Sequence, residues 1–174
     1  MGCSATVPSL ASRLCLSCSL CCDGTLHGYA VIKDAEVEET AALGLDTFTT
    51  AAGQSAFAFP CHYLEGKACT RYDSWRPSIC GDYFCRVQAR VASEELTEQQ
   101  AFALVHQARG LRDEVASLLP PGMPMVEARE HFRKLAADRH NLGPQDAKLV
   151  VRMFVMERLL DSEFRGKGAG HLPS

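Results

Sequence analysis

The feature that most constrains this chain is a run of cysteines close to its N-terminal end. Two residues separate Cys15 from Cys18 and Cys18 from Cys21, and Cys22 follows Cys21 directly. Two cysteines at this spacing can turn both sulfurs toward one ion, with backbone N–H groups left free to bond the sulfurs. Because neighbouring side chains diverge, we expect Cys21 and Cys22 to serve two metals, or only one of them to bind. The run therefore predicts a metal site.

Further cysteines follow this run, and none occurs after Cys85. Cys61 and Cys69 flank a predicted hairpin turn at Glu65-Gly66-Lys67, and Cys80 and Cys85 flank a short turn. Eight thiolates fill two tetrahedral zinc sites, two four-thiolate clusters, or one cluster with spare thiols. The candidate metal ligands are Cys15, Cys18, Cys21, Cys22, Cys61, Cys69, Cys80 and Cys85.

Core packing and disulfide bonding both account for the cysteines less well than metal binding does. One buried cysteine usually acts as a small apolar side chain, but eight clustered within residues 15–85 do not fit that account. Disulfides need an oxidising compartment, and no secretory signal begins the sequence. Gly2 and Cys3 fit a loose lipidation pattern, but no basic run follows, so we treat Cys3 as incidental. We expect a cytoplasmic chain with reduced thiols.

Composition and charge exclude several classes of protein. Hydrophobic residues make up 47% and charged residues 22% of the 174 residues, so disordered, collagen-like and coiled-coil chains are excluded. The formal net charge is -3, and neither half of the chain is basic, so we expect no nucleic acid as partner. No apolar stretch approaches the roughly 20 residues that a membrane-spanning helix needs, so we expect no membrane partner either.

The sequence divides into two parts that together predict an α+β fold. Residues 13–91 hold the eight cysteines and most turn signals, and we expect a small metal-binding domain of short strands and turns. Residues 92–165 show helical periodicity and are expected to form a three-helix part. Residues 1–12 and 166–174 are expected to be flexible.

Individual elements are predicted from caps, breakers and periodicity. In the first part we expect a strand at Tyr29–Lys33, a short helix capped by Asp34, and strands at Phe57–Leu64 and from Ala68. In the second part we expect one helix from an N-cap at Ser93 to Pro120, one over Met125–Asp138, and one over Pro144–Phe164.

The cysteines and a few residues between them resemble a known family. The run Cys15-x2-Cys18-x2-Cys21-Cys22 is followed by Cys61, Cys69, Tyr72, Arg76-Pro77, Cys80 and Cys85. Together these residues resemble the YkgJ-type CxxCxxCC cysteine-cluster proteins. That family is described as a zinc- or iron-chelating domain and includes the flagellin lysine N-methylases. The resemblance covers about residues 15–90 and implies that the eight cysteines are the metal ligands. The sequence has no glycine-rich strand-to-helix loop for S-adenosylmethionine, so methyl transfer is not carried over.

Zinc and an iron–sulfur cluster both suit such ligands. The first three cysteines match the start of a ferredoxin run, but Cys22 and Asp23 replace its Cys-Pro end. We lean slightly toward an iron–sulfur cluster. Arg76 is a candidate to offset thiolate charge, and Tyr72 to bond a sulfur. Among the histidines we consider His62 as a ligand first and His27 second.

The residues support three hypotheses about function. No nucleophile elbow, phosphate loop or zinc-protease motif is present, and eight thiolates on two centres would leave no open coordination position. The first hypothesis is a metal-binding protein with a structural or electron-holding role. The second is a metal-dependent protein-modifying enzyme of the methylase kind. The third is a zinc-stabilised module that binds a protein partner through its C-terminal helices.

Overall fold

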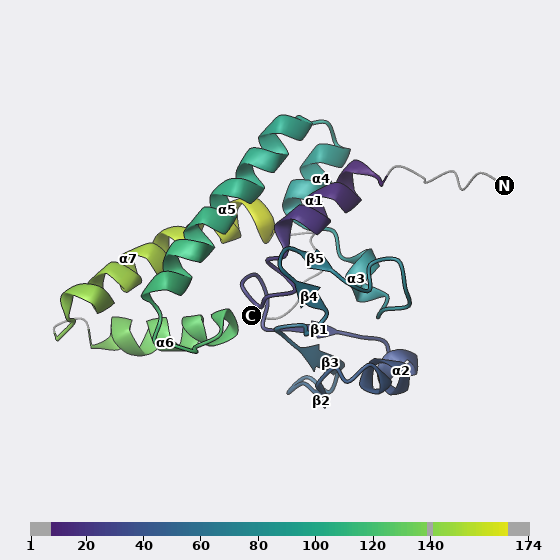
Figure 1. Ribbon diagram of the computed structural model, residues 1–174, viewed down its shortest axis with the longest axis horizontal. Coiled ribbons are helices and arrows are strands. Elements are labelled where there is room, and N and C mark those ends of the chain that lie inside the picture. Colours follow the sequence, from purple (N-terminus) through teal and green to yellow (C-terminus); the bar gives the residue numbers. More distant parts are fainter. Residues whose placement is uncertain (1–7, 139–140, 167–174) are drawn as a thin grey trace.

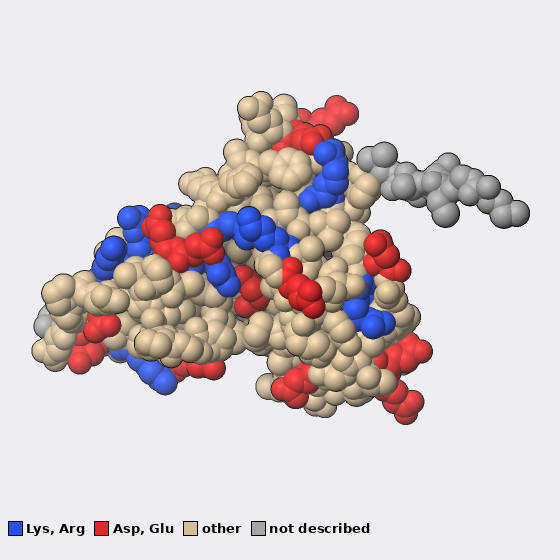
Figure 2. All heavy atoms as spheres, viewed as in Figure 1, with Lys and Arg blue, Asp and Glu red and all other residues tan. Residues whose placement is uncertain are grey.

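The computed structural model describes residues 8–138 and 141–166. It confirms the expected α+β fold, in which small antiparallel sheets lie beside a group of longer helices (Figure 1). In the part of the chain that the structure describes, no helix is both long and apolar enough to cross a membrane. On the face seen in Figure 2, basic and acidic side chains are interspersed over the helices.

The helical part is built around α5 (Glu98–Leu118). This helix packs against α1 (Leu10–Cys18), α4 (Arg86–Ala92) and α7 (Pro144–Leu159), which continues as the π-helical turn η2 (Leu160–Phe164); α6 (Met125–Ala137) packs against α7 (Figure 1). Their apolar faces form the larger hydrophobic core. We call this the helical core; its fully buried side chains include Leu14, Val115, Met153, Leu160 and Phe164.

The sheet part is smaller. β1 (Tyr29–Val31), β3 (Ser55–Ala58) and β2 (Thr47–Thr49) form one antiparallel sheet in the order β1-β3-β2. The turn η1 (Asp34–Glu36) leads into α2 (Val37–Ala42), which packs against β2 and β3. Four buried residues of this part form a second core, the sheet core, consisting of Ala30, Ile32, Leu45 and Phe57.

A two-stranded hairpin and a short helix complete this part. β4 (Leu64–Glu65) pairs with β5 (Ala68–Cys69), as the predicted turn requires. Gly66 in this turn has φ +60°, a conformation that residues with a side chain rarely adopt. The helix α3 (Ile79–Asp82) follows and carries Cys80.

Two of the three C-terminal helices agree with the expectation, and the start of the first does not. The structure places α6 and α7 with η2 over the predicted ranges, but α5 begins after Thr97 and not after Ser93. The Thr97 hydroxyl accepts a bond from the Gln100 N–H (3.3 Å), and the Gln100 side chain accepts one from the Thr97 N–H (2.8 Å). This reciprocal cap satisfies two N–H groups at once, whereas Ser93 ends the separate helix α4.

Two further expectations are corrected. Residues 10–12, expected to be flexible, begin α1, because the Ser9 hydroxyl caps this helix by accepting the Ser12 N–H at 3.1 Å. The strand expected over Phe57–Leu64 is divided, since β3 ends at Ala58 and Leu64 belongs to the other sheet. Pro60 lies between the two and has no N–H to donate to a strand partner.

Candidate metal centre

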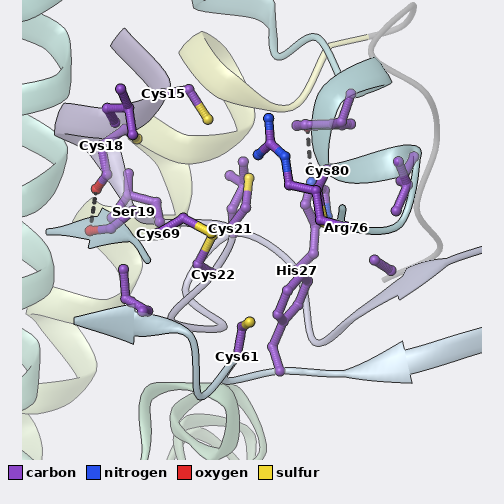
Figure 3. A pocket seen from close by; sticks show the side chains of 18 of the residues that line it. Cys15, Cys18, Ser19, Cys21, Cys22, His27, Cys61, Cys69, Arg76 and Cys80 are labelled. Atoms are coloured by element: carbon purple, nitrogen blue, oxygen red, sulfur yellow. Dashed lines mark hydrogen bonds between the residues drawn. The ribbon is translucent and has the colours of Figure 1, made fainter. Parts of the chain in front are cut away.

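All eight candidate cysteines line one cavity of about 110 Å³ between the helical part and the sheet part. Each of them is a free thiol. Figure 3 shows the labelled cysteines and Arg76 around this cavity, with contributions from segments that lie far apart in the sequence. Cys3 falls among residues 1–7, outside the described residues.

The first four cysteines are held partly by a helix and partly by a loop. Cys15 and Cys18 lie one turn apart near the end of α1, and the chain leaves the helix at Ser19, which has φ +59°. Cys21 and Cys22 follow in residues 19–28, here called the cysteine loop. Cys15 and Cys18 thus lie on a helix, which the cysteine spacing alone did not indicate.

Gly24 shapes the cysteine loop just after Cys22. Its φ is +82°, and a Cβ placed on it would lie 2.9 Å from the Cβ of Val126 on α6. A side chain at this position would therefore strain the backbone and collide with α6 at the same time. The loop carrying Cys21 and Cys22 is in this way pressed directly against a C-terminal helix.

Two arginines of the C-terminal helices bind the carbonyl groups of the cysteine loop. Arg129 on α6 donates to the Thr25 carbonyl, and Arg165 donates to the Leu26 carbonyl at 3.0 Å. Glu157 on α7 pairs with both arginines, at 3.0 and 2.7 Å. The C-terminal helices thus position the loop that carries two of the candidate ligands.

The later cysteines are tied to the first four by hydrogen bonds. The Cys61 N–H donates to the Cys22 carbonyl at 2.8 Å. The Cys85 N–H donates to the Gln88 side chain at 3.0 Å, and the same side chain donates to the Ala11 carbonyl of α1 at 3.0 Å. Gln88, which sequence reasoning missed, therefore joins the segment of Cys85 to the helix of Cys15 and Cys18.

Burial makes most of these thiols harder to ionise. The pKa of Cys18 and of Cys80 is raised to about 12, by burial first and by neighbouring thiols second. The pKa of Cys21 and of Cys22 is also raised, by burial first and by neighbouring thiols second. At neutral pH these four side chains are neutral, and thiolates form here only when a positive charge compensates them.

Arg76 is the cation best placed to compensate the charge of a thiolate in this cavity. Its guanidinium stacks 4.2 Å from the centre of the Tyr72 ring and lies toward Cys15 and Cys80 (Figure 3). It lowers the pKa of both thiols, against the larger effect of burial. No carboxylate of the described residues forms an ion pair with Arg76. Tyr72 packs under the guanidinium.

The structure reverses the expected order of the two candidate histidines, His62 first and His27 second. His27 lines the cavity and shares a hydrogen bond of 2.9 Å with the hydroxyl of the partly buried Tyr83. His62 does not line the cavity and packs on the Tyr63 ring. Adjacency to Cys61 was the signal for His62, but consecutive side chains point apart. Nothing in the sequence spacing indicated that Tyr83 would meet His27.

The donor set fits a thiolate metal centre in its chemistry and in its shared cavity. Among residues 8–138 and 141–166, however, no group of three or more His, Cys, Asp or Glu side chains is arranged to hold a metal ion as it stands. The eight sulfurs surround the cavity and are not gathered at one point.

Comparisons with known proteins add nothing to this geometry. No family model matches the chain, and neither the curated proteins nor the solved structures yield a match. The resemblance to the cysteine-cluster family therefore stays a prediction that depends on the residues quoted above.

Proposed function

We propose that this chain is a metal-binding protein that holds zinc or an iron–sulfur cluster through its eight clustered cysteines. The observation that carries the proposal is that eight free thiols from five separate segments line one cavity. In a reducing compartment, such a concentration of thiols is typical of metal binding rather than of disulfides. The cytoplasmic location that we propose agrees with reduced thiols.

The cavity walls suit a centre that is shielded from water. Leu14, Phe57 and Val87 line the cavity and are almost completely buried. Zinc, when bound, supplies charge and fixed geometry, and an iron–sulfur cluster would in addition hold an electron. A cysteine has one side-chain torsion before its sulfur, so a change of rotamer is the shortest movement that would bring the sulfurs together. Because the cavity walls are apolar, we retain our slight preference for an iron–sulfur cluster over zinc.

The proposed role is structural or electron-holding. The cavity lies where the helical core meets the sheet core, and ligands from both parts would be joined by one metal-binding region. Structural metal sites supply folding free energy directly, on the order of 10 kcal/mol per site. The sheet core has few buried residues, so it would gain most from such a link.

The two other hypotheses stay predictions. No described feature favours methyl transfer over metal binding alone. For the protein partner, the inner faces of α5, α6 and α7 are used in packing, so a partner of these helices would meet their outer faces. On α7 the exposed apolar side chains are Val151, Phe154 and Val155.

Anaerobic purification followed by metal analysis and a visible spectrum tests the proposal. A brown protein with a broad band at about 400 nm and with bound iron would identify a cluster, and a colourless protein with about two zinc ions per chain would identify zinc. Cys18→Ser and Cys80→Ser should each lose metal, and Cys3→Ser should keep it. A wild-type chain with neither metal, or equal metal content in all variants, would contradict the proposal.

A further inference from the structure

The two hydrophobic cores divide the cysteines between them. Cys18, Cys21 and Cys85 pack against the helical core. Cys61 and Cys80 pack against the sheet core. None of the described cysteines packs against both cores. Because cores are close-packed and rigid, the side to which each of these five cysteines belongs is fixed by the fold.

Backbone contacts place two more cysteines with the sheet core. The Cys22 carbonyl accepts the Cys61 N–H at 2.8 Å. The Cys61 carbonyl accepts the Leu64 N–H at 3.0 Å, and Leu64 is the partner of Cys69 across the β4–β5 pair. Cys22, Cys61 and Cys69 are thus linked in one continuous backbone network, and Cys80 joins them through the shared core.

The helical side has its own link. The Gln88 side chain bonds the Cys85 N–H and the Ala11 carbonyl, so the start of α4 is fastened to the helix that carries Cys15 and Cys18. Cys21 lies beyond the end of that helix and is partly buried against the same core.

Electrostatic neighbours repeat this division at the two adjacent cysteines. Besides Cys22, the thiols near enough to interact electrostatically with Cys21 are Cys18, Cys15 and Cys85. Those near enough to interact with Cys22 are Cys15, Cys61, Cys80 and Cys69. Apart from Cys15 and the pair itself, the two neighbourhoods have no member in common.

Cys15 interacts with both neighbourhoods, and coordination number decides where it belongs. A tetrahedral site takes four thiolates. The sheet side already has four, namely Cys22, Cys61, Cys69 and Cys80, whereas the helical side has three. Cys15 lies one helical turn before Cys18 and completes the helical set.

Building on the proposed function, we propose that the eight cysteines form two separate four-thiolate metal centres, one against each core. The helical centre consists of Cys15, Cys18, Cys21 and Cys85, and the sheet centre consists of Cys22, Cys61, Cys69 and Cys80. The neighbours Cys21 and Cys22 therefore bind different metals, and Arg76 lies near Cys15 and Cys80, one ligand of each centre.

Counting bound zinc in pairs of double variants tests this division. The purified chain is reconstituted anaerobically with Zn²⁺ alone, and zinc per chain is measured by elemental analysis. The wild type should bind two ions. The double variant Cys22→Ser/Cys69→Ser removes ligands from one centre only and should keep one ion. Cys21→Ser/Cys22→Ser, with the same number of substitutions, damages both centres and should keep none.

A second pair of double variants keeps the test valid if a variant of the first pair does not fold. Cys18→Ser/Cys85→Ser lies within the helical set and should keep one ion, whereas Cys18→Ser/Cys80→Ser crosses the sets and should keep none. Equal zinc counts in the within-set and cross-set variants, or one ion in the wild type, would overturn the division. A wild type that binds no zinc and contains no iron would instead overturn the proposed function itself.

Discussion

Burial favours the protonated form of Cys18 and of Cys80. The pKa of Cys18 and of Cys80 is raised to about 12, mainly because the surroundings of each thiol disfavour a charge. A metal binds the thiolate, so binding at neutral pH releases the protons that these thiols carry. The thiols thus exchange protons for metal, and the exchange becomes easier as the pH rises.

We therefore expect each four-thiolate centre to release close to four protons when Zn²⁺ binds at pH 7. The apparent affinity should increase with pH by about tenfold per pH unit for every proton released. A pH indicator in weakly buffered solution, read during a zinc titration, measures the release. Release of fewer than about two protons per zinc would mean that most of these thiols are not ligands.

Arg76 is expected to support metal binding by offsetting thiolate charge. Arg76→Gln removes the charge near Cys15 and Cys80, and residues that support metal ligands typically contribute 10-fold to 100-fold in affinity. We expect a loss of about tenfold in a zinc competition titration. Arg71→Gln is the control: this side chain stacks 5.2 Å from the Tyr63 ring and donates to the Trp75 carbonyl. An equal loss in both variants would indicate a general effect of charge.

At the scale of the elements, α7 has two different faces. Its inner face enters the helical core and carries Glu157, which pairs with the arginines that hold the cysteine loop. Its outer face is exposed although it is apolar. Met153 is completely buried, and the next residue, Phe154, is 59% exposed. Neighbouring residues on this helix therefore contribute to stability in different ways.

Met153→Ala should lower the free energy of unfolding by about 2–5 kcal/mol, because it leaves a cavity in the helical core. Phe154→Ala should change it by less than about 0.5 kcal/mol, since its side chain packs little against this chain. Urea unfolding of the two variants under reducing conditions measures both values. A similar loss in the two variants would contradict the assignment of the outer face.

At the scale of the whole molecule, two cores of unequal size meet at the cysteine cavity. The helical core has 16 buried residues and the sheet core has four among the described residues. Buried apolar area is the main source of stability, so the sheet part depends more on the proposed metal. The metal would then act as part of the sheet core.

Removing the metal with a chelator under reducing conditions should loosen the sheet part first. Amide hydrogen exchange should become faster over residues 28–82, whereas α5 and α7 should keep their protection. Mass spectrometry of exchanged fragments measures both regions in one sample. Uniform loss of protection over both parts would show that the two cores unfold together.

One hydrophobic core spans the predicted boundary at residues 91 and 92. Leu14, Leu20, Leu26 and Val87 precede that boundary, yet they belong to the same core as α5, α6 and α7. The helices after residue 92 also hold the cysteine loop through Arg129 and Arg165. Removal of residues 93–174 would therefore expose the core beneath the first cysteines, so surface substitutions on α7 test a partner better than truncation does.

The sequence by itself determined the α+β class, the ranges of α6 and α7, the β4–β5 turn and the set of clustered cysteines. These depend on local signals: helical periodicity, caps, a glycine turn and the spacing of one residue type. The start of α5 was also encoded locally, in Thr97 and Gln100, but a second cap at Ser93 competed with it.

Only the tertiary structure decided which cysteines lie together. Cys21 packs against the helical core, whereas the neighbouring Cys22 accepts the Cys61 N–H at its carbonyl. Gln88 fastens the segment of Cys85 to the helix that carries Cys18. The roles of His27, Gln88 and Arg129 likewise depend on partners that are distant in the chain. Side-chain neighbours across a cavity are set by how two cores pack against each other, and residue spacing carries no direct record of that packing.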